Sequence, residues 1–216
     1  MKKSHVAALS ATAVAAVAMM GFSASNVIGK EPRFVQMTME QLNPAQKSLG
    51  EDVMKISSVG LGGPYNPMMR SPEMGRHMFD LMGYLRLKTS VPLKLNEFAI
   101  LIIGRQWRSQ VEWYAHVPIA MKNGLSKEII DDLRQKKRPS KMAPDETVVY
   151  DFVTELMEKH EVSDATFAAT KKLLGEQGVV DLTAVAGTYV AVAALLAVSE
   201  EMPPAGKELQ FKPSDP

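Results

Sequence analysis

The stretch LNEFAILIIGRQWRSQVEWYAHVPIAMKNG, residues 95–124, is the part of the sequence that is most informative about fold and function. It holds two carboxylates and one imidazole, those of Glu97, Glu112 and His116, and such groups suffice to move protons on and off carbon without a cofactor. The segment is predicted to form either two helices or one helix that is disturbed near Gly104. Asn123-Gly124 is typical of a helix C-terminus and is predicted to end the helical segment.

Glu112 and His116 are four residues apart, so on a helix their side chains share one face. A carboxylate beside an imidazole raises the pKa of the imidazole and fixes its orientation, which prepares it for proton transfer. The alternative is a solvated surface pair, which is the commoner role of a Glu–His pair at this spacing.

Aromatic residues surround this pair in the sequence, namely Trp107, Trp113 and Tyr114. Aromatic side chains around a carboxylate remove it from water and raise its pKa towards the working pH. The alternative is that both tryptophans belong to the hydrophobic core.

Glu97 lies among apolar neighbours, so its carboxylate either faces solvent or is buried with a partner. Arg105 and Arg108 are the nearest cations, and either could bind a substrate carboxylate in a forked geometry. Structural ion pairing is the alternative for each. Two glutamates and one histidine could also ligate a divalent metal, but no zinc-type spacing occurs, and no metal is expected.

Residues 1–25 are predicted to be a secretory signal peptide. Lys2 and Lys3 precede an apolar run from Val6 to Met20, and the small residues Ser23-Ala24-Ser25 suit cleavage after position 25. The mature protein is therefore expected to be periplasmic or secreted, with no membrane association after cleavage. An uncleaved N-terminal anchor is the alternative, although a span needs about 20 apolar residues.

The charge and the absence of cysteine limit the function further. Removing residues 1–25 removes two lysines and no acid, which changes the net charge from +1 to −1, so nothing favours a nucleic-acid partner. The chain has no cysteine, so it has no disulfide framework and cannot be a thiol peroxidase or use a thiol nucleophile.

The remaining segments predict an all-α protein with one domain. Asn43-Pro44 is a helix start, and an apolar run from Leu182 to Val198 is expected to be buried core or an oligomer contact. Residues 26–54 are interpreted as an N-terminal extension with one helix, residues 55–205 as the domain, and residues 206–216 as an extended tail. The other expected helices are 44–56, one opening at 71–73, 126–133, 147–159, 163–174 and 182–198, and the Gly- and Pro-rich residues 57–67 are expected to form no regular element.

The segment 95–124 resembles the carboxymuconolactone decarboxylase family, within the alkylhydroperoxidase D-like superfamily. The redox branch has a glutamate, eleven residues, Cys-x-x-Cys, three residues and a histidine. Glu97, Ser109, Glu112 and His116 fall at those spacings, with serine and glutamate in place of the cysteines.

The decarboxylase branch resembles this chain more closely, because Ala120 and Asn123-Gly124 match it as well. Asn96 departs from it, since an arginine commonly precedes the first glutamate. The likeness extends to Gly63-Pro64-Tyr65, Ser71-Pro72-Glu73 and Gly187-Thr188-Tyr189 and covers most of residues 55–205. It implies an all-α, alkylhydroperoxidase D-like helical fold that builds its site near a subunit interface in a homotrimer or homohexamer.

The function expected from these residues is that of an exported, cofactor-independent lyase or isomerase acting on a small carboxylated lactone or aromatic breakdown product. His116 is expected to be the general acid or base. Glu112 is expected to orient it, and Glu97 to be the second proton-transfer group or to polarise the substrate. The expected pocket wall is Trp107, Trp113, Tyr65 and Tyr189, with Arg105 as the carboxylate anchor.

Two alternatives stay open. One is an exported binding protein that keeps the fold and has lost the chemistry. The other is peroxidase activity like that of the redox branch, which the missing thiols nearly exclude.

Overall fold

The computed structural model describes residues 31–57 and 59–211. Within these ranges every regular element is a helix, which confirms the all-α fold class. The predicted signal peptide and residues 212–216 of the predicted tail lie outside the described residues.

The N-terminal part contains a 3-10 turn, η1 (Met39–Gln41), and helix α1 (Pro44–Ile56), which starts as predicted. The Asn43 side chain accepts a hydrogen bond from the backbone N–H of Gln46, and the Gln46 side chain accepts one from Asn43. The loop at 57–67 was expected to have no regular element, but it contains the short helix α2 (Tyr65–Met68). Pro67 is tolerated in this single turn because the first backbone N–H groups of a helix have no intrahelical acceptor. The N–H group that proline lacks is therefore not needed there.

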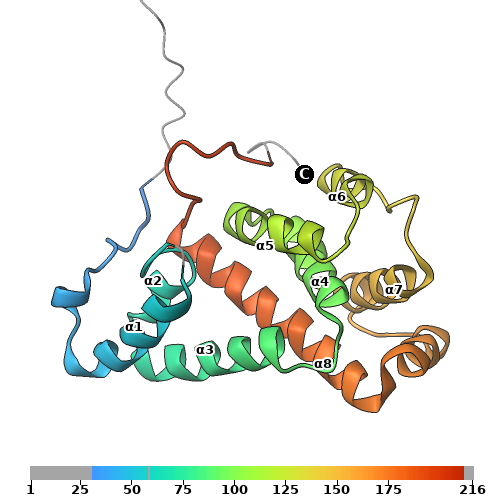
Figure 1. Cartoon of the computed structure of the whole chain (residues 1–216), viewed down its shortest axis with the longest axis horizontal. Helices are drawn as coiled ribbons and strands as arrows, with labels where there is room; N and C mark the ends of the chain where they lie inside the picture. Colours follow the sequence, from blue (N-terminus) through green and yellow to red (C-terminus); the bar gives the residue numbers. More distant parts are fainter. Residues whose placement is uncertain (1–30, 58, 212–216) are drawn as a thin grey trace, which may run out of the picture.

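Helices α3 (Pro72–Leu87), α4 (Leu93–Gln106) and α5 (Gln110–Lys122) form the centre of the molecule. The segment 95–124 is thus two helices: Arg108 takes a positive φ of 53°, and Ser109 caps α5. Every residue of α4 from Leu95 to Arg105 is buried, because α5, α7 and α8 all pack on it (Figure 1). Gly104 permits this close packing, since a Cβ there would lie 3.2 Å from Trp113.

Helices α6 (Lys127–Arg134), α7 (Pro144–Lys159) and α8 (Asp164–Ser199) complete the fold. α8 is divided at Gly175, whose φ of 72° and ψ of 178° are not helical. The two predicted helices of this region are therefore present, but the second begins directly after Gly175 and not at Leu182. Its later part is buried core, and half of its most apolar window is covered by the rest of the protein. Packing thus accounts for a helix that is long and apolar enough, by length and composition, to span a membrane.

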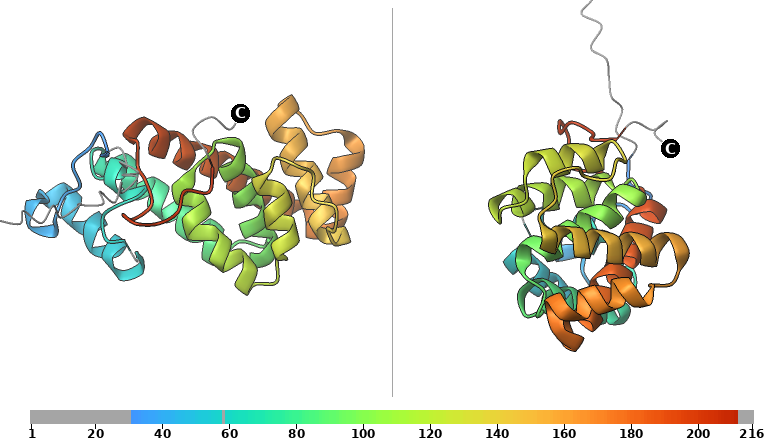
Figure 2. Two further views of the ribbon diagram at one scale, coloured as in Figure 1. Left: turned by 90° about the horizontal axis from the view of Figure 1, so that it is seen from above. Right: turned by 90° about the vertical axis from the view of Figure 1, so that its right-hand side faces the viewer.

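The molecule is elongated, with α1 and α2 at one end and α6 and α7 at the other (Figure 2). Helix α8 runs between these ends, and α3 lies along it. The segment after α8 returns across α5, where the side chain of Gln110 bonds to the backbone of Gln210 and Phe211. The C-terminal end of the described chain thereby lies beside α5.

Asp181 of α8 holds the connection between α3 and α4 in place. Its carboxylate accepts hydrogen bonds from the Ser90 backbone N–H at 2.8 Å, the Ser90 hydroxyl at 2.9 Å and the Thr89 hydroxyl at 3.0 Å. We expect Asp181→Ala to lower the free energy of unfolding by about 2–3 kcal/mol, because it leaves several donors without their charged acceptor. Urea unfolding followed by circular dichroism measures this, with Asp80→Ala at an exposed position of α3 as the control. Equal losses in the two variants would contradict this role of Asp181.

Candidate functional site

A cavity of about 560 Å³ lies between the N-terminal loop, α3, α5, α8 and the segment that follows α8. Its polar wall consists chiefly of Tyr65, Arg86, Glu112, Tyr114, His116, Tyr189 and Glu201. Much of the rest is apolar, including Ile56, Val59, Met82, Val111, Ile119, Val192, Leu196 and Met202. Predominantly apolar cavities with a few polar groups are typical of small-molecule sites, and this one is of the usual size.

His116 is held by Glu97, which reaches it from the neighbouring helix. Nδ1 of His116 lies 2.6 Å from Oε2 of Glu97, and both side chains are almost completely buried. Glu97 lies behind the imidazole and does not line the cavity, whereas His116 does. No described residue bonds the second ring nitrogen, Nε2, so that atom is available to a molecule in the cavity.

The expectation that Glu112 orients His116 is therefore wrong. The packing of α4 against α5 brings Glu97 to the imidazole, although nineteen positions separate the two residues. Helical spacing on α5 alone could not show this, because it contains no information about the neighbouring helix.

Glu112 is a buried acid on the cavity wall. It stands in the first turn of α5, where its backbone N–H donates to the hydroxyl of Ser109, the N-cap, at 3.5 Å. Neither carboxyl oxygen makes a hydrogen bond of good geometry within the described residues. Burial raises the pKa of Glu112 to about 8, and the nearby Ser109 hydroxyl lowers it by a smaller amount. The side chain is thus mainly protonated at neutral pH.

Tyr189 and Tyr65 line the same cavity, where the sequence analysis places them. The Tyr189 ring meets the His116 ring edge to face, with centroids 5.2 Å apart and planes at 85°. Its hydroxyl is buried and makes no hydrogen bond to a described residue. Burial raises the pKa of both phenols, so both are neutral hydrogen-bond donors at neutral pH.

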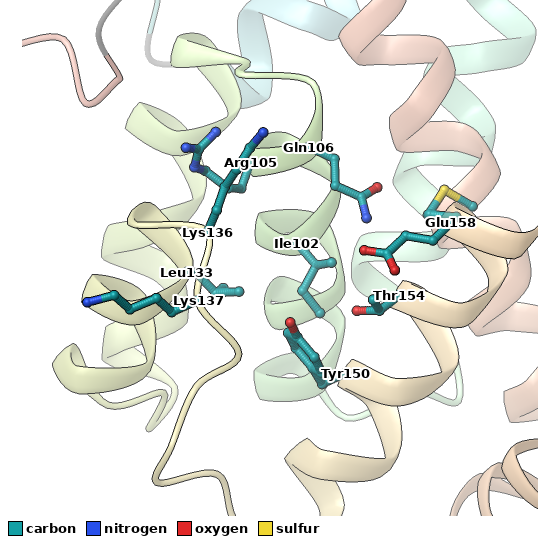
Figure 3. A pocket seen from close by; sticks show the side chains of 10 residues that line it. Ile102, Arg105, Gln106, Leu133, Lys136, Lys137, Tyr150, Thr154 and Glu158 are labelled. Carbon is teal, nitrogen blue, oxygen red and sulfur yellow. The ribbon is translucent and has the colours of Figure 1, made fainter. Parts of the chain in front are cut away.

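Arg105, Trp107 and Trp113 do not line this cavity. Nε of Arg105 donates to the backbone carbonyl of Arg134 at 2.8 Å, and Arg105 lines a separate cavity of about 290 Å³. Figure 3 shows that second cavity between α4 and α7, with Ile102 and Tyr150 beside it.

The tryptophans take core and surface positions. Trp113 is buried with its ring 4.9 Å from that of Phe211, as the core alternative predicts, and Trp107 is 42% exposed. The expected pocket wall was wrong for these residues because sequence neighbours on a helix point to different faces. Trp113 follows Glu112 directly and so points away from the cavity.

Two ionisable residues of the cavity were not predicted from the sequence. Arg86 of α3 lines it, and its Nε is buried without a hydrogen bond to any described residue. Glu201 lines it as well, accepts from Nδ2 of Asn66 at 2.6 Å, and has a pKa that burial raises. A signal for Arg86 exists, since it lies four residues after Met82 on the apolar face of its helix.

Within residues 31–57 and 59–211, no three histidine, aspartate or glutamate side chains are grouped closely enough to hold a metal ion. The site residues Glu97, Glu112 and His116 are thus arranged as a bonded pair and a separate acid.

No family model matches this chain, and no curated protein matches it either. Among solved structures it is similar to an uncharacterized peroxidase-related protein from Ralstonia eutropha JMP134, described as an alkylhydroperoxidase AhpD core. The TM-score is 0.67 with 13% identity, over 81% of this chain and 93% of that one. The likeness confirms the alkylhydroperoxidase D-like fold. It leaves the branch and the activity open, because folds of this kind host different chemistries.

Proposed function

We propose that this protein is a cofactor-independent lyase or isomerase that transfers protons on a small carboxylated lactone or aromatic breakdown product. The observation that carries the proposal is that one cavity contains an imidazole oriented by a buried carboxylate and a second carboxyl group whose pKa is about 8.

His116 acts as the general base. Its Nε2 takes a proton from a carbon next to a carbonyl, and the electron pair moves onto the carbonyl oxygen. The Glu97 carboxylate stabilises the imidazolium that forms, because the two groups share a hydrogen bond out of contact with water.

Glu112 acts as the general acid. Its proton passes to the oxygen or carbon where negative charge develops, which completes the substrate. The imidazolium proton then passes through solvent to the Glu112 carboxylate, which restores both groups for the next turnover. His116 and Glu112 stand on one face of α5, so both reach the same molecule. Two titratable groups with different protonation at one pH are the arrangement that acid–base enzymes use.

We also propose that the protein is exported and forms a homotrimer or homohexamer. The features of residues 1–25 support export, and the resemblance to the carboxymuconolactone decarboxylase family supports the oligomer. Exposed apolar side chains on α3, such as Leu81 and Leu87, also support a subunit contact. Light scattering of the protein after size-exclusion chromatography measures the oligomer, and mass spectrometry of the exported chain measures the cleavage position.

The test of the chemistry is proton exchange in deuterated buffer. A panel of small carboxylated lactones and aromatic breakdown acids is incubated with the purified chain in the presence of EDTA and followed by proton NMR. We expect at least one compound to lose a carbon-bound proton signal or to convert, with EDTA present. A compound that binds and is recovered with every proton in place would favour the non-catalytic binding protein. Consumption of organic hydroperoxide would favour a peroxidase instead.

A further inference from the structure

We propose that the cavity binds a monocarboxylate with an apolar body, and that Arg86 is the residue that binds its carboxylate. This inference rests on the proposed function, because it names the substrate class of the same site.

Arg86 has no acidic partner among the described residues, unlike several other arginines. Its side chain lines the cavity, its Nε is buried, and it makes no hydrogen bond or ion pair to any described residue. Several other arginines pair with an acid: Arg33 with Glu200, Arg76 with Asp52, Arg134 with Asp131 and Arg138 with Asp151. A partly buried guanidinium without a counter-ion is costly, and a carboxylate that binds both its N–H edges offsets that cost.

The charge of the cavity limits the ligand to one carboxylate. Arg86 is the one lysine or arginine among the described residues that line it. Of the two lining acids, Glu112 is mainly protonated at neutral pH, and Glu201 is bound by Asn66. A second carboxylate on the ligand would have no cation and would lie among apolar side chains, which is unfavourable.

The remainder of the wall suits an apolar body. Met82 of α3, Val111 and Ile119 of α5, and Val192 and Leu196 of α8 surround the space beside Arg86 and His116. A volume of about 560 Å³ accommodates a ring or short chain together with the carboxylate.

Tyr65 and Tyr189 complete the anion site. Both phenols line the same cavity as Arg86. The positive charge of Arg86 lowers their pKa, although the larger effect of burial raises it. The buried Tyr189 hydroxyl has no acceptor among the described residues. It can donate to the ligand carboxylate while Arg86 binds it, which holds the ligand beside the imidazole.

The experiment compares benzoate with benzamide, which has the same shape and no charge, by isothermal titration calorimetry. We expect the wild-type protein to bind benzoate at least ~10-fold more tightly, because the ligand carboxylate and the guanidinium form charge-assisted hydrogen bonds that the neutral amide cannot form. Phthalate, with a second carboxylate, should bind more weakly than benzoate. Arg86→Met should remove the preference for benzoate, and Arg86→Lys should keep part of it.

Lys88→Met is the matched control, since it removes one positive charge from an exposed position two residues further along. It should leave both affinities unchanged. Equal affinity for benzoate and benzamide in the wild type, no benzoate binding, or full retention of the preference in Arg86→Met would each overturn the proposal. If Arg86→Met does not fold, a preference in Arg86→Lys equal to that of the wild type overturns it.

Binding of benzoate needs no proton transfer, so the two proposals fail separately. A preference for the carboxylate without proton exchange in any compound would reject the proposed function and keep the Arg86 site. Proton exchange on a compound whose neutral amide reacts equally well would reject the Arg86 site and keep the function.

Discussion

Replacing His116 with glutamine is expected to lower turnover of the substrate by about 10²–10⁴-fold, which is the usual contribution of a positioned general base. Glutamine can donate a hydrogen bond to Glu97 but cannot accept a proton at neutral pH. It is preferred to alanine because alanine would leave the buried Glu97 carboxylate without a partner, which destabilises a fold by itself.

The measurement is kcat and KM for a compound identified by proton exchange, together with the melting temperature. His77→Gln is the control, since His77 is an exposed histidine of α3 that does not line the cavity. Turnover by His116→Gln within about twofold of the wild type, with an unchanged fold, would be incompatible with the proposed chemistry.

Replacing Glu112 with glutamine is expected to stabilise the protein at alkaline pH while it reduces turnover. The folded pKa of Glu112 is about 8, against 4.5 for the ordinary group. Between these values the unfolded chain releases the proton and the folded chain keeps it, so the free energy of unfolding falls as pH rises. At about 1.4 kcal/mol for each unit of pKa, the loss by pH 8 is roughly 4–5 kcal/mol at most.

Urea unfolding at pH 5 and pH 8 measures this effect. Glutamine has nearly the same shape and does not ionise, so the wild type should lose several kcal/mol more than Glu112→Gln between the two pH values. Glu73→Gln, at an exposed position of α3, is the control for the loss of a carboxyl group. An identical pH dependence in wild type and Glu112→Gln would show that the pKa of Glu112 is not raised.

A gain in stability at alkaline pH together with a loss of turnover in Glu112→Gln would be informative about function. An acid that is kept in an apolar site for its chemistry is expected to destabilise the fold and to be needed for turnover. A structural residue would show the opposite, with stability lost when it is replaced.

The local structure of the helices could be predicted closely from the sequence. Asn43 and Gln46 cap α1 as expected, and α5 ends at the Asn123-Gly124 signal. Such features depend on residues within a few positions of each other, which the sequence states directly. The short helix α2 and the early start of the second part of α8 were missed, because tertiary packing supports elements whose local signals are weak.

The sequence by itself determined the residue types of the site. It identified Glu97, Glu112 and His116 as candidates for acid–base chemistry, and the absence of cysteine excluded thiol chemistry. The resemblance to the carboxymuconolactone decarboxylase family, which rests on their spacing, also implied the helical fold that the solved structure shares.

Only the tertiary structure decided which of these groups meet. The packing of α4 on α5 brings His116 into hydrogen-bond contact with Glu97 and leaves Glu112 as a separate buried acid. Helix α3 contributes Arg86 to the cavity, whereas Arg105 bonds elsewhere. The physical reason is that a pKa or an ion pair depends on distance and on exclusion of water, and both are properties of helices that touch although they are distant in the chain.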